Sequence, residues 1–454
     1  MTRSADTLTG LQQALAAGRT TSRELTERAL AAATGSSEAA ATFVTVHAAQ
    51  ARASADAIDA QRAAGLALPP LAGIPISIKD LFDEAGQVTR AGSRVLDDAA
   101  PAERDCPVVA RLRGAGAVII GRTNMTEFAY SGLGINPHHG TPRNPWDRAT
   151  GRIPGGSSSG AAVSVTDGMA AAAIGSDTGG SVRIPAALCG LTGFKPTARR
   201  VPLEGVLPLS GSLDSIGPLA RSVDCCAQLD AIMAGQTPTS LTPAPLAGKR
   251  FWLPRTVMFD GVDDAVGQAI ERALQRLSQA GARLVEIEMP AFADLARINR
   301  AGGFTAAEAW WWHAELIGRH AAGYDPRVLV RIRRGAAMSA ADYLSLRVER
   351  QRWIATVSAS LDGDLMLMPT LPIVAPAIAP LRDSDTEYDR TNQLVLRNAA
   401  PINFLDGCAL TLPCHREGEA PAGLMLAGCG GQDAAVLRAG AAIEAVLGAG
   451  NSQL

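Results

Sequence analysis

Two Gly-Gly-Ser units constrain the fold of this chain more than any other feature of its sequence. They occupy residues 155–157 and 179–181. Glycine allows positive φ angles and the close approach of other groups to its amides, so such units can form a nest of backbone N–H groups for an anion. A serine beside such a nest can attack a carbonyl carbon while the amides hold the oxyanion that forms. The sequence between the units is rich in alanine and glycine, which is typical of a tightly packed helix followed by a buried strand.

The segment 155–185 closely resembles the signature of the amidase signature family of serine hydrolases, which use a Ser-cisSer-Lys triad. By this resemblance, Ser157 is the bridging serine, preceded by a cis peptide bond, and Ser181 is the nucleophile. The family's lysine ends an upstream strand with an apolar, proline-containing pattern. The sequence GIPISIKD at 73–80 matches that pattern and identifies Lys79 as the lysine.

The three matched side chains indicate a proton relay. Lys79 follows a run of apolar and small residues that predicts a buried strand. Burial lowers the pKa of a lysine because desolvation penalises the cation, and a neutral amine can act as a base. The amine would accept the Ser181 proton by way of the Ser157 hydroxyl and later return it to the leaving nitrogen. A Ser-Lys relay needs no histidine, and the segment contains none.

Residues around the nucleophile are expected to support this chemistry. Asp177 and Arg183 flank Ser181 and are expected to orient its loop, and Ser158 is a candidate for a supporting hydrogen bond. Loss of one oxyanion donor typically costs about 10²–10³ in rate. The backbone amides expected to form the oxyanion hole are those of Thr178, Gly179, Gly180 and Ser181.

A second serine motif overlaps the first Gly-Gly-Ser unit. Residues 156–160 match the G-x-S-x-G nucleophile elbow of α/β-hydrolases, with Ser158 at the centre. That fold needs an acid and a histidine downstream, and the three later histidines stand in no evident triad setting, so the amidase interpretation is favoured. The adjacent His138 and His139 lack nearby cysteine or carboxylate ligands, which makes a poor zinc site and predicts a metal-free loop that faces solvent.

Composition limits the kinds of binding partner and the cellular compartment that we expect for this protein. A net charge of −2 with 19% charged residues gives no reason to expect a nucleic acid or an acidic surface as partner. Residues 1–17 do not resemble a secretory signal, and no apolar run reaches the ~20 residues of a membrane span. The seven cysteines are odd in number and form no C-x-x-C pair, which favours reduced thiols in a soluble cytoplasmic protein. No cofactor is expected, because the relay and the oxyanion hole supply the chemistry, and the resemblance allows a homodimer.

Helical and strand-like patterns alternate along the chain. Residues 71–78 and 118–120 are typical of buried strands, with a helix between them at about 106–117. This alternation predicts an α/β fold with parallel strands. The resemblance implies one domain over 1–454, built on a large twisted mixed β-sheet flanked by α-helices on both sides.

The resemblance is dense over a signature core at about 70–220 and sparse over a more variable, mostly helical region at about 243–362. Within that region we expect long helices over 291–320 and 339–361. Residues 203–220 are rich in glycine, proline and serine, which predicts an extended loop.

The chain contains only 4% aromatic residues, yet three of its tryptophans are consecutive: Trp310, Trp311 and Trp312. On a helix, consecutive side chains point about 100° apart, so one buried face cannot cover all three rings. One interpretation is that two pack in the core and one lies on the surface. The other is that at least one lines the acyl or leaving-group pocket opposite Tyr130 and Leu133, which would favour hydrophobic or aryl substrates.

The function expected from these residues is hydrolysis of a linear carboxylic amide through a Ser181 acyl-enzyme. Cleavage of carbamates, urea-type bonds or esters by the same machinery stays open, because related enzymes differ mainly in their pockets. The A subunit of a tRNA-dependent amidotransferase is another alternative, although its usual Gly-Ser-Ser-Thr-Glu run is replaced by YSGLG at 130–134. The last alternative is an inactive binding protein on the same scaffold, and the presence of all three triad residues argues against it.

Overall fold

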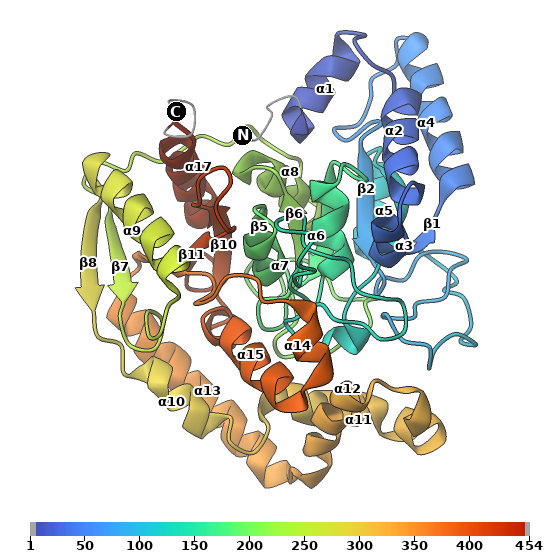
Figure 1. Ribbon diagram of the computed structural model, residues 1–454. Coiled ribbons are helices and arrows are strands. Elements are labelled where there is room, and N and C mark those ends of the chain that lie inside the picture. Colours follow the sequence, from blue (N-terminus) through green and yellow to red (C-terminus); the bar gives the residue numbers. More distant parts are fainter. Residues whose placement is uncertain (1–5, 450–454) are drawn as a thin grey trace.

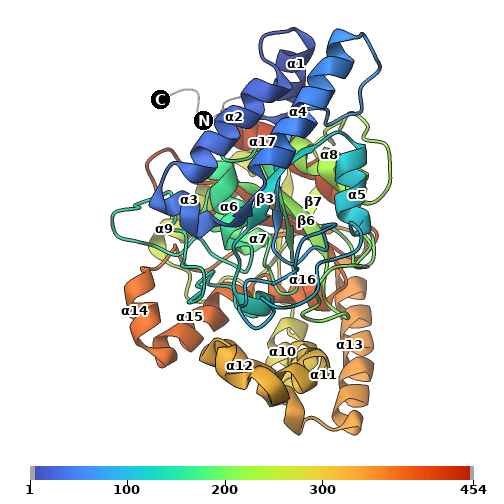
Figure 2. The ribbon, with the colours of Figure 1, turned by 90° about the vertical axis from the view of Figure 1, so that its right-hand side faces the viewer.

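The computed structural model describes residues 6–449. Within them, eleven strands form one continuous sheet in the order β1-β3-β2-β4-β6-β5-β10-β11-β9-β7-β8. Helices cover both faces of this sheet (Figures 1 and 2). The large mixed sheet flanked by helices that the resemblance implied is therefore confirmed.

The strands of the middle of the sheet are buried on both faces, as their apolar and small residues require. The bounds of the strands are β1 (Phe43–Val46), β2 (Pro75–Lys79), β3 (Val118–Thr123), β4 (Ala172–Ser176), β5 (Thr192–Lys195), β6 (Ile216–Ala220), β7 (Arg250–Pro254), β8 (Arg283–Ile287), β9 (Leu365–Pro369), β10 (Cys408–Pro413) and β11 (Gly423–Gly428). From β4 to β9 the neighbours pair antiparallel. Parallel pairs flank this middle part, with β2 between β3 and β4 on one side and β7 between β9 and β8 on the other.

The helices form a layer on each face of the sheet. Among the described residues the α-helices are α1 (Leu8–Ala16), α2 (Ser22–Thr34), α3 (Ser37–Thr42), α4 (Ala48–Ala63), α5 (Pro107–Gly114), α6 (Ser159–Thr166), α7 (Arg183–Leu188), α8 (Val223–Met233), α9 (Asp264–Gln279), α10 (Ala291–Ile298), α11 (Gly303–His320), α12 (Pro326–Arg333), α13 (Ala340–Leu361), α14 (Ile378–Asp383), α15 (Asp385–Arg397), α16 (Ala400–Phe404) and α17 (Asp433–Ala449). Short 3₁₀ helices are η2 (Glu127–Ala129), η3 (Ala321–Gly323) and η4 (Arg334–Ala337). Helices α6 and α7 pack on one face, and α8, α9 and α17 pack on the other. Within residues 6–449, no helix has the length and hydrophobicity of a membrane span.

The parallel pairing of β2 with β4 brings the polar residues of the signature core to one edge of the sheet. The last residues of these two strands, Lys79 and Ser176, lie at the same end because the strands run in the same direction. The segment 177–182 follows β4 directly and leads into α7. The carboxyl ends of parallel strands are where α/β proteins place their ligand sites.

Helices α10 to α13 gather beyond one end of the sheet, at the lower edge of Figures 1 and 2. The prediction of one helix over 291–320 is wrong, because residues 299–302 separate α10 from α11. Gly302 and Gly303, at the start of α11, have φ angles of 125° and 71°. Glycine tolerates positive φ, which a continuous right-handed helix does not contain. The expected helix over 339–361 is confirmed, and its capping box pairs the Ser339 and Asp342 side chains with each other's backbone amides.

The prediction of an extended loop over 203–220 is wrong at its end, where strand β6 lies between β4 and β5. Gly217 and Pro218 concealed the strand, because both residue types usually mark loops and proline cannot donate to a ladder. Glycine is required at 217 for a packing reason: an added Cβ would lie 2.0 Å from the carbonyl oxygen of Phe194 on the neighbouring strand.

Candidate active site

Lys79 ends β2 with a fully buried side chain. Its Nζ donates hydrogen bonds to Ser157 Oγ at 2.7 Å and to Ser176 Oγ at 2.8 Å. Burial lowers the pKa of Lys79 to about 7, because desolvation of the cation outweighs the attraction of the Asp177 and Asp214 carboxylates. Near neutral pH a substantial share of this amine is therefore uncharged and able to accept a proton.

Ser157 follows a cis peptide bond from Gly156, as the resemblance implied. Its side chain is fully buried. The next amide, that of Ser158, donates to the Ser181 carbonyl oxygen at 3.3 Å and so joins the two Gly-Gly-Ser units. The turn that carries Ser157 thus contacts both Lys79 and the segment that carries Ser181.

Ser181 lies between β4 and α7 and lines a cavity of about 390 Å³. Among the hydrogen bonds of residues 6–449, none involves its hydroxyl group. A relay needs a further contact between the Ser181 and Ser157 hydroxyls, and catalytic hydrogen bonds commonly tighten only when a substrate binds. Ser158, the centre of the alternative elbow motif, does not line this cavity, and its buried hydroxyl donates to the Ser176 carbonyl oxygen at 3.4 Å.

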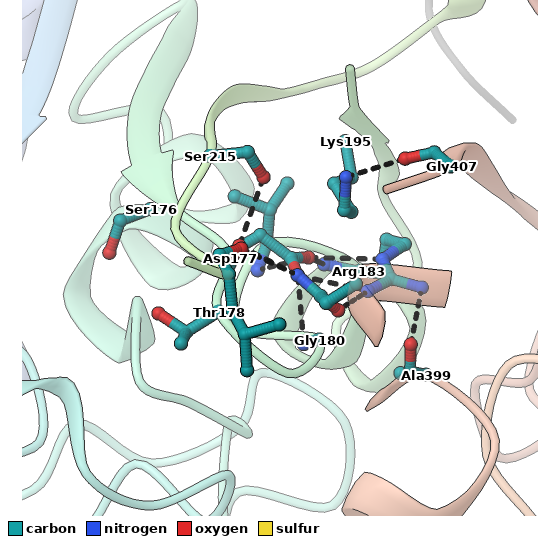
Figure 3. A network of polar contacts seen from close by, with 12 residues as sticks. Ser176, Asp177, Thr178, Gly180, Arg183, Lys195, Ser215, Ala399 and Gly407 are labelled. Carbon is teal, nitrogen blue, oxygen red and sulfur yellow. Dashed lines mark hydrogen bonds and ion pairs between the residues drawn. The ribbon is translucent and has the colours of Figure 1, made fainter. Parts of the chain in front are cut away.

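A fully buried ion pair holds the loop that carries Ser181 (Figure 3). Arg183 donates from Nη2 to Asp177 Oδ1 at 2.9 Å and from Nε to Oδ2 at 3.0 Å. Asn403 Nδ2 adds a hydrogen bond to Asp177 Oδ1 at 2.9 Å. Burial alone would raise the pKa of Asp177, but the Arg183 charge and these hydrogen bonds hold it well below its usual range. The geometry agrees with an orienting role for Asp177 and Arg183.

The backbone amides beside Ser181 differ from the expected set of four. The Gly180 amide donates to Asp177 Oδ1 at 2.8 Å, so it already has a partner. Within the described part of the chain, the amides of Thr178, Gly179 and Ser181 donate no hydrogen bond. Gly180 has a φ of 124°, and an added Cβ would lie 2.6 Å from a neighbouring side chain, so glycine is required there. Of the four amides expected to form an oxyanion hole, three are therefore without a partner among the described residues.

Asp214, which no sequence motif indicated, also holds the loop that carries Ser181. Thr178 Oγ1 donates to Asp214 Oδ1 at 2.5 Å. The amides of Leu209 and Ser210 donate to Asp214 Oδ2 at 3.0 Å each. Burial raises the pKa of Asp214 to about 6, although the hydrogen bonds act in the opposite direction. A single carboxylate in a stretch rich in glycine and serine gave no sequence signal for this role.

The cavity at Ser181 combines an apolar wall with two guanidinium groups. The apolar wall comes from Leu209, Leu213, Leu295, Phe304, Leu396 and Phe404. Tyr130 lines the cavity, and so do Arg331 and Arg397. The two arginines were missed because their segments show no motif, and Phe304 was missed because the helix break before it was not predicted.

The other predicted pocket residues lie elsewhere. Leu133 is fully buried in a separate apolar cluster and does not line the cavity. Trp312 packs against neighbouring aromatic rings, while Trp310 and Trp311 line an adjacent cavity of about 560 Å³. The prediction that a tryptophan lines the pocket at Ser181 is wrong, because α11 faces that pocket with its first turn, at Phe304, and not with its middle. The alternative holds instead: two rings are partly buried and that of Trp311 is 79% exposed.

The histidine loop also differs from its prediction. His138 does not face solvent freely, since its side chain is only 14% exposed and its Nε2 lies 2.8 Å from Glu127 Oε1. The other carboxylate oxygen of Glu127 accepts the Asp325 amide at 2.7 Å. This polar cluster therefore joins the loop to the segment before α12.

The chain around this site matches the Amidase family over residues 24–437. The match covers most of the sequence, and the protein belongs to the amidase signature family.

Individual relatives carry different named activities. The 2-amino-5-chloromuconic acid deaminase of Comamonas testosteroni is 38% identical over 89% of this chain and 88% of that protein. The A subunit of the glutamyl-tRNA(Gln) amidotransferase of Roseiflexus castenholzii is 36% identical over 97% of this chain and 95% of that protein. A solved structure described as an amidase has a TM-score of 0.87 at 32% identity and covers 97% of this chain and 99% of that chain.

Proposed function

We propose that this protein hydrolyses carboxylic amides through an acyl-enzyme on Ser181. The observation that carries the proposal is the fully buried Lys79 amine, whose pKa is lowered to about 7 and whose Nζ lies 2.7 Å from Ser157 Oγ. Two neutral hydroxyl groups do little to offset the desolvation of an ammonium group, so a stabilising role explains this placement poorly. A base for a serine nucleophile explains it well.

In the first half of the reaction, Ser181 Oγ attacks the carbonyl carbon of the amide. Its proton passes to the Ser157 hydroxyl, whose own proton passes to Lys79 Nζ. The carbonyl oxygen becomes an oxyanion held by the free amides of the nucleophile loop. The proton then returns through Ser157 to the leaving nitrogen, and the C–N bond breaks. Water attacks the acyl-enzyme by the same relay, and the carboxylic acid leaves.

The cavity supports a preference for hydrophobic or aryl groups. Four leucines and two phenylalanines form its apolar wall. The rings of Phe304 and Phe404 lie with centroids 6.0 Å apart, in a tilted arrangement that offers an apolar surface to a substrate. Such a wall favours anilides and longer alkyl amides over small polar amides.

A substrate panel tests the proposal. We expect wild-type protein to hydrolyse an anilide faster than an acetamide-sized amide, a carbamate or an ester, and Ser181→Ala to hydrolyse none of them. A fluorophosphonate should label Ser181, which peptide mapping would reveal. An adduct on Ser158 would favour the elbow mechanism. Absence of both labelling and turnover would favour an inactive binding protein.

A second candidate function is that of an amidotransferase component that releases ammonia for a partner. The 36% identity to the Roseiflexus castenholzii amidotransferase protein over 97% of this chain favours it. The apolar cavity wall and the YSGLG sequence at 130–134 argue against it. Glutamine hydrolysis that exceeds anilide hydrolysis, together with partner proteins that co-purify, would make this candidate the better one.

A further inference from the structure

One arginine in the Ser181 cavity has no partner for the end of its side chain. Arg397 lines the cavity, and its one side-chain hydrogen bond within residues 6–449 runs from Nε to Asn398 Oδ1 at 3.0 Å. Its Nη2 atom is buried without a hydrogen-bond partner. A buried polar group normally has a partner, and a guanidinium offers a planar fork of donors that matches a carboxylate. Neither Nη atom has a partner among the described residues, so the guanidinium has donors to offer a ligand in the cavity.

Arg331, in the same cavity, provides an internal comparison. Its Nη2 donates to Asp389 Oδ1 at 2.6 Å, and its Nη1 donates to the Tyr130 carbonyl oxygen at 3.2 Å. Its guanidinium also lies over the Tyr388 ring, 5.0 Å from the centroid. The protein itself supplies a carboxylate for Arg331, whereas the described residues supply none for Arg397.

Arg397 is fixed on the side away from its free nitrogens. Asn398 is fully buried, and its Nδ2 donates to the carbonyl oxygens of Met258 and Pro369 at 2.8 Å each. These two bonds leave the side-chain oxygen of Asn398 as the acceptor for Arg397 Nε. A guanidinium anchored in this way loses little conformational entropy when a ligand binds its Nη atoms.

The charge of Arg397 is poorly compensated. Burial lowers its pKa, and the opposing attraction comes from Asp260, an exposed residue that forms no ion pair with it within the described chain. A carboxylate ligand would replace the lost hydration with charge-assisted hydrogen bonds, in a cavity whose apolar wall strengthens electrostatic attraction.

We propose that Arg397 binds a carboxylate of the substrate. The inference rests on the proposed hydrolysis at Ser181 and names its substrate class: an amide with an apolar body and a carboxylate separate from the scissile bond. The apolar wall receives the body, Arg397 receives the carboxylate, and the amides of the nucleophile loop receive the scissile carbonyl oxygen. A neutral amide of the same length makes the first and third contacts but not the second.

Matched substrates test this inference. The monoamides of succinic, glutaric and adipic acid are compared with butanamide, pentanamide and hexanamide. For the length that fits, wild-type kcat/KM should favour the monoamide about 100-fold, and Arg397→Gln should remove that preference mainly through KM. The neutral amide should change less than about threefold, as expected of a contact it never makes. Arg397→Lys should retain part of the preference, because it keeps the charge but not the planar fork.

Arg333→Gln is the matched control, because it removes the same charge from an exposed position on α12 that does not line the cavity. It should leave the preference for monoamides intact. An equal loss in Arg333→Gln and Arg397→Gln, or an equal loss for charged and neutral amides, would overturn the carboxylate subsite.

Direct binding separates this inference from the proposed hydrolysis. Ser181→Ala protein is titrated calorimetrically with glutarate and adipate, with and without Arg397→Gln. Addition of Arg397→Gln should weaken dicarboxylate binding at least about tenfold. If the wild type cleaves no amide and this weakening is observed, the hydrolase proposal fails and the subsite stands. If amides are cleaved and Arg397→Gln weakens neither binding nor turnover, the subsite is wrong.

Discussion

A fully buried arginine beside Ser181 is paired within the protein, whereas a half-buried arginine at the end of α15 is not. At the sheet edge, Arg183 is fully buried and its donors are bonded to Asp177 and Asn403. At the end of α15, Arg397 keeps its Nη donors unpaired beside the cavity, among the residues that the structure describes. Arg183 stabilises the protein's own fold, whereas Arg397 has donors that can bind a substrate.

This difference matches two requirements of the site: catalysis needs a rigid loop, and specificity needs a group that can bind the substrate. A catalytic loop must hold one shape, so its polar atoms are paired within the protein and are costly to disturb. A specificity group must exchange partners, so its polar atoms are left for the substrate. Loss of the first kind should damage the fold, whereas loss of the second should damage recognition alone.

The largest effect is expected at the nucleophile. Ser181→Ala should lower kcat at least about 10⁴-fold, because the acyl-enzyme can no longer form. The Asp177–Arg183 pair does not involve the Ser181 hydroxyl, so the urea midpoint should stay that of the wild type. Anilide turnover and urea unfolding measure the two quantities. Near-normal turnover would refute the nucleophile assignment.

Lys79→Met should lower kcat/KM about 10³-fold, within the usual range for a general base. In the wild type, kcat/KM should rise about tenfold per pH unit below pH 7 and level off above it, because the neutral amine is the active form and its pKa is about 7. The pH profile of Asp214→Asn is the control, since burial raises that carboxyl's pKa to about 6. Loss of the inflection in that variant would assign it to Asp214 instead.

The two arginines should respond differently to the same substitution. Arg183→Gln should lower the free energy of unfolding by about 3–5 kcal/mol, because it leaves the buried Asp177 carboxylate without its counter-ion. Arg397→Gln should change it by less than about 1 kcal/mol, because no buried carboxylate loses a partner. Urea unfolding followed by circular dichroism measures both. Equal losses would show that Arg397 is structural.

The smallest effect is expected at the apolar wall. Phe304→Leu should raise KM for an anilide about threefold to tenfold by removing an aromatic contact. Trp311→Ala should leave KM unchanged, because this ring is 79% exposed beside the adjacent cavity. A larger change in KM for Trp311→Ala than for Phe304→Leu would show that the tryptophans do line the substrate pocket.

Local patterns were sufficient for the features that depend on neighbouring residues. The two Gly-Gly-Ser units and the GIPISIKD strand indicated Ser157, Ser181 and Lys79, and the structure brings Lys79 and Ser157 into hydrogen-bond contact. The resemblance to the amidase signature family also implied the cis bond before Ser157, which the structure contains. Each of these features is a property of a few consecutive residues, so its signal lies within one short window of sequence.

Features that depend on residues far apart in the chain were decided by the tertiary structure alone. The amide of Gly180 was expected to be free, yet a carboxylate three residues earlier folds back onto it because a nearby arginine and a distant asparagine hold that carboxylate in place. The cavity wall is assembled from segments between 209 and 404, and none of them carries a motif.

The sequence shows that an arginine is charged, but it does not show whether that arginine has a partner. Arg331 is paired because Asp389, 58 residues away, reaches it, and Arg397 is unpaired because no described carboxylate does. Only the folded chain brings such partners within hydrogen-bond distance.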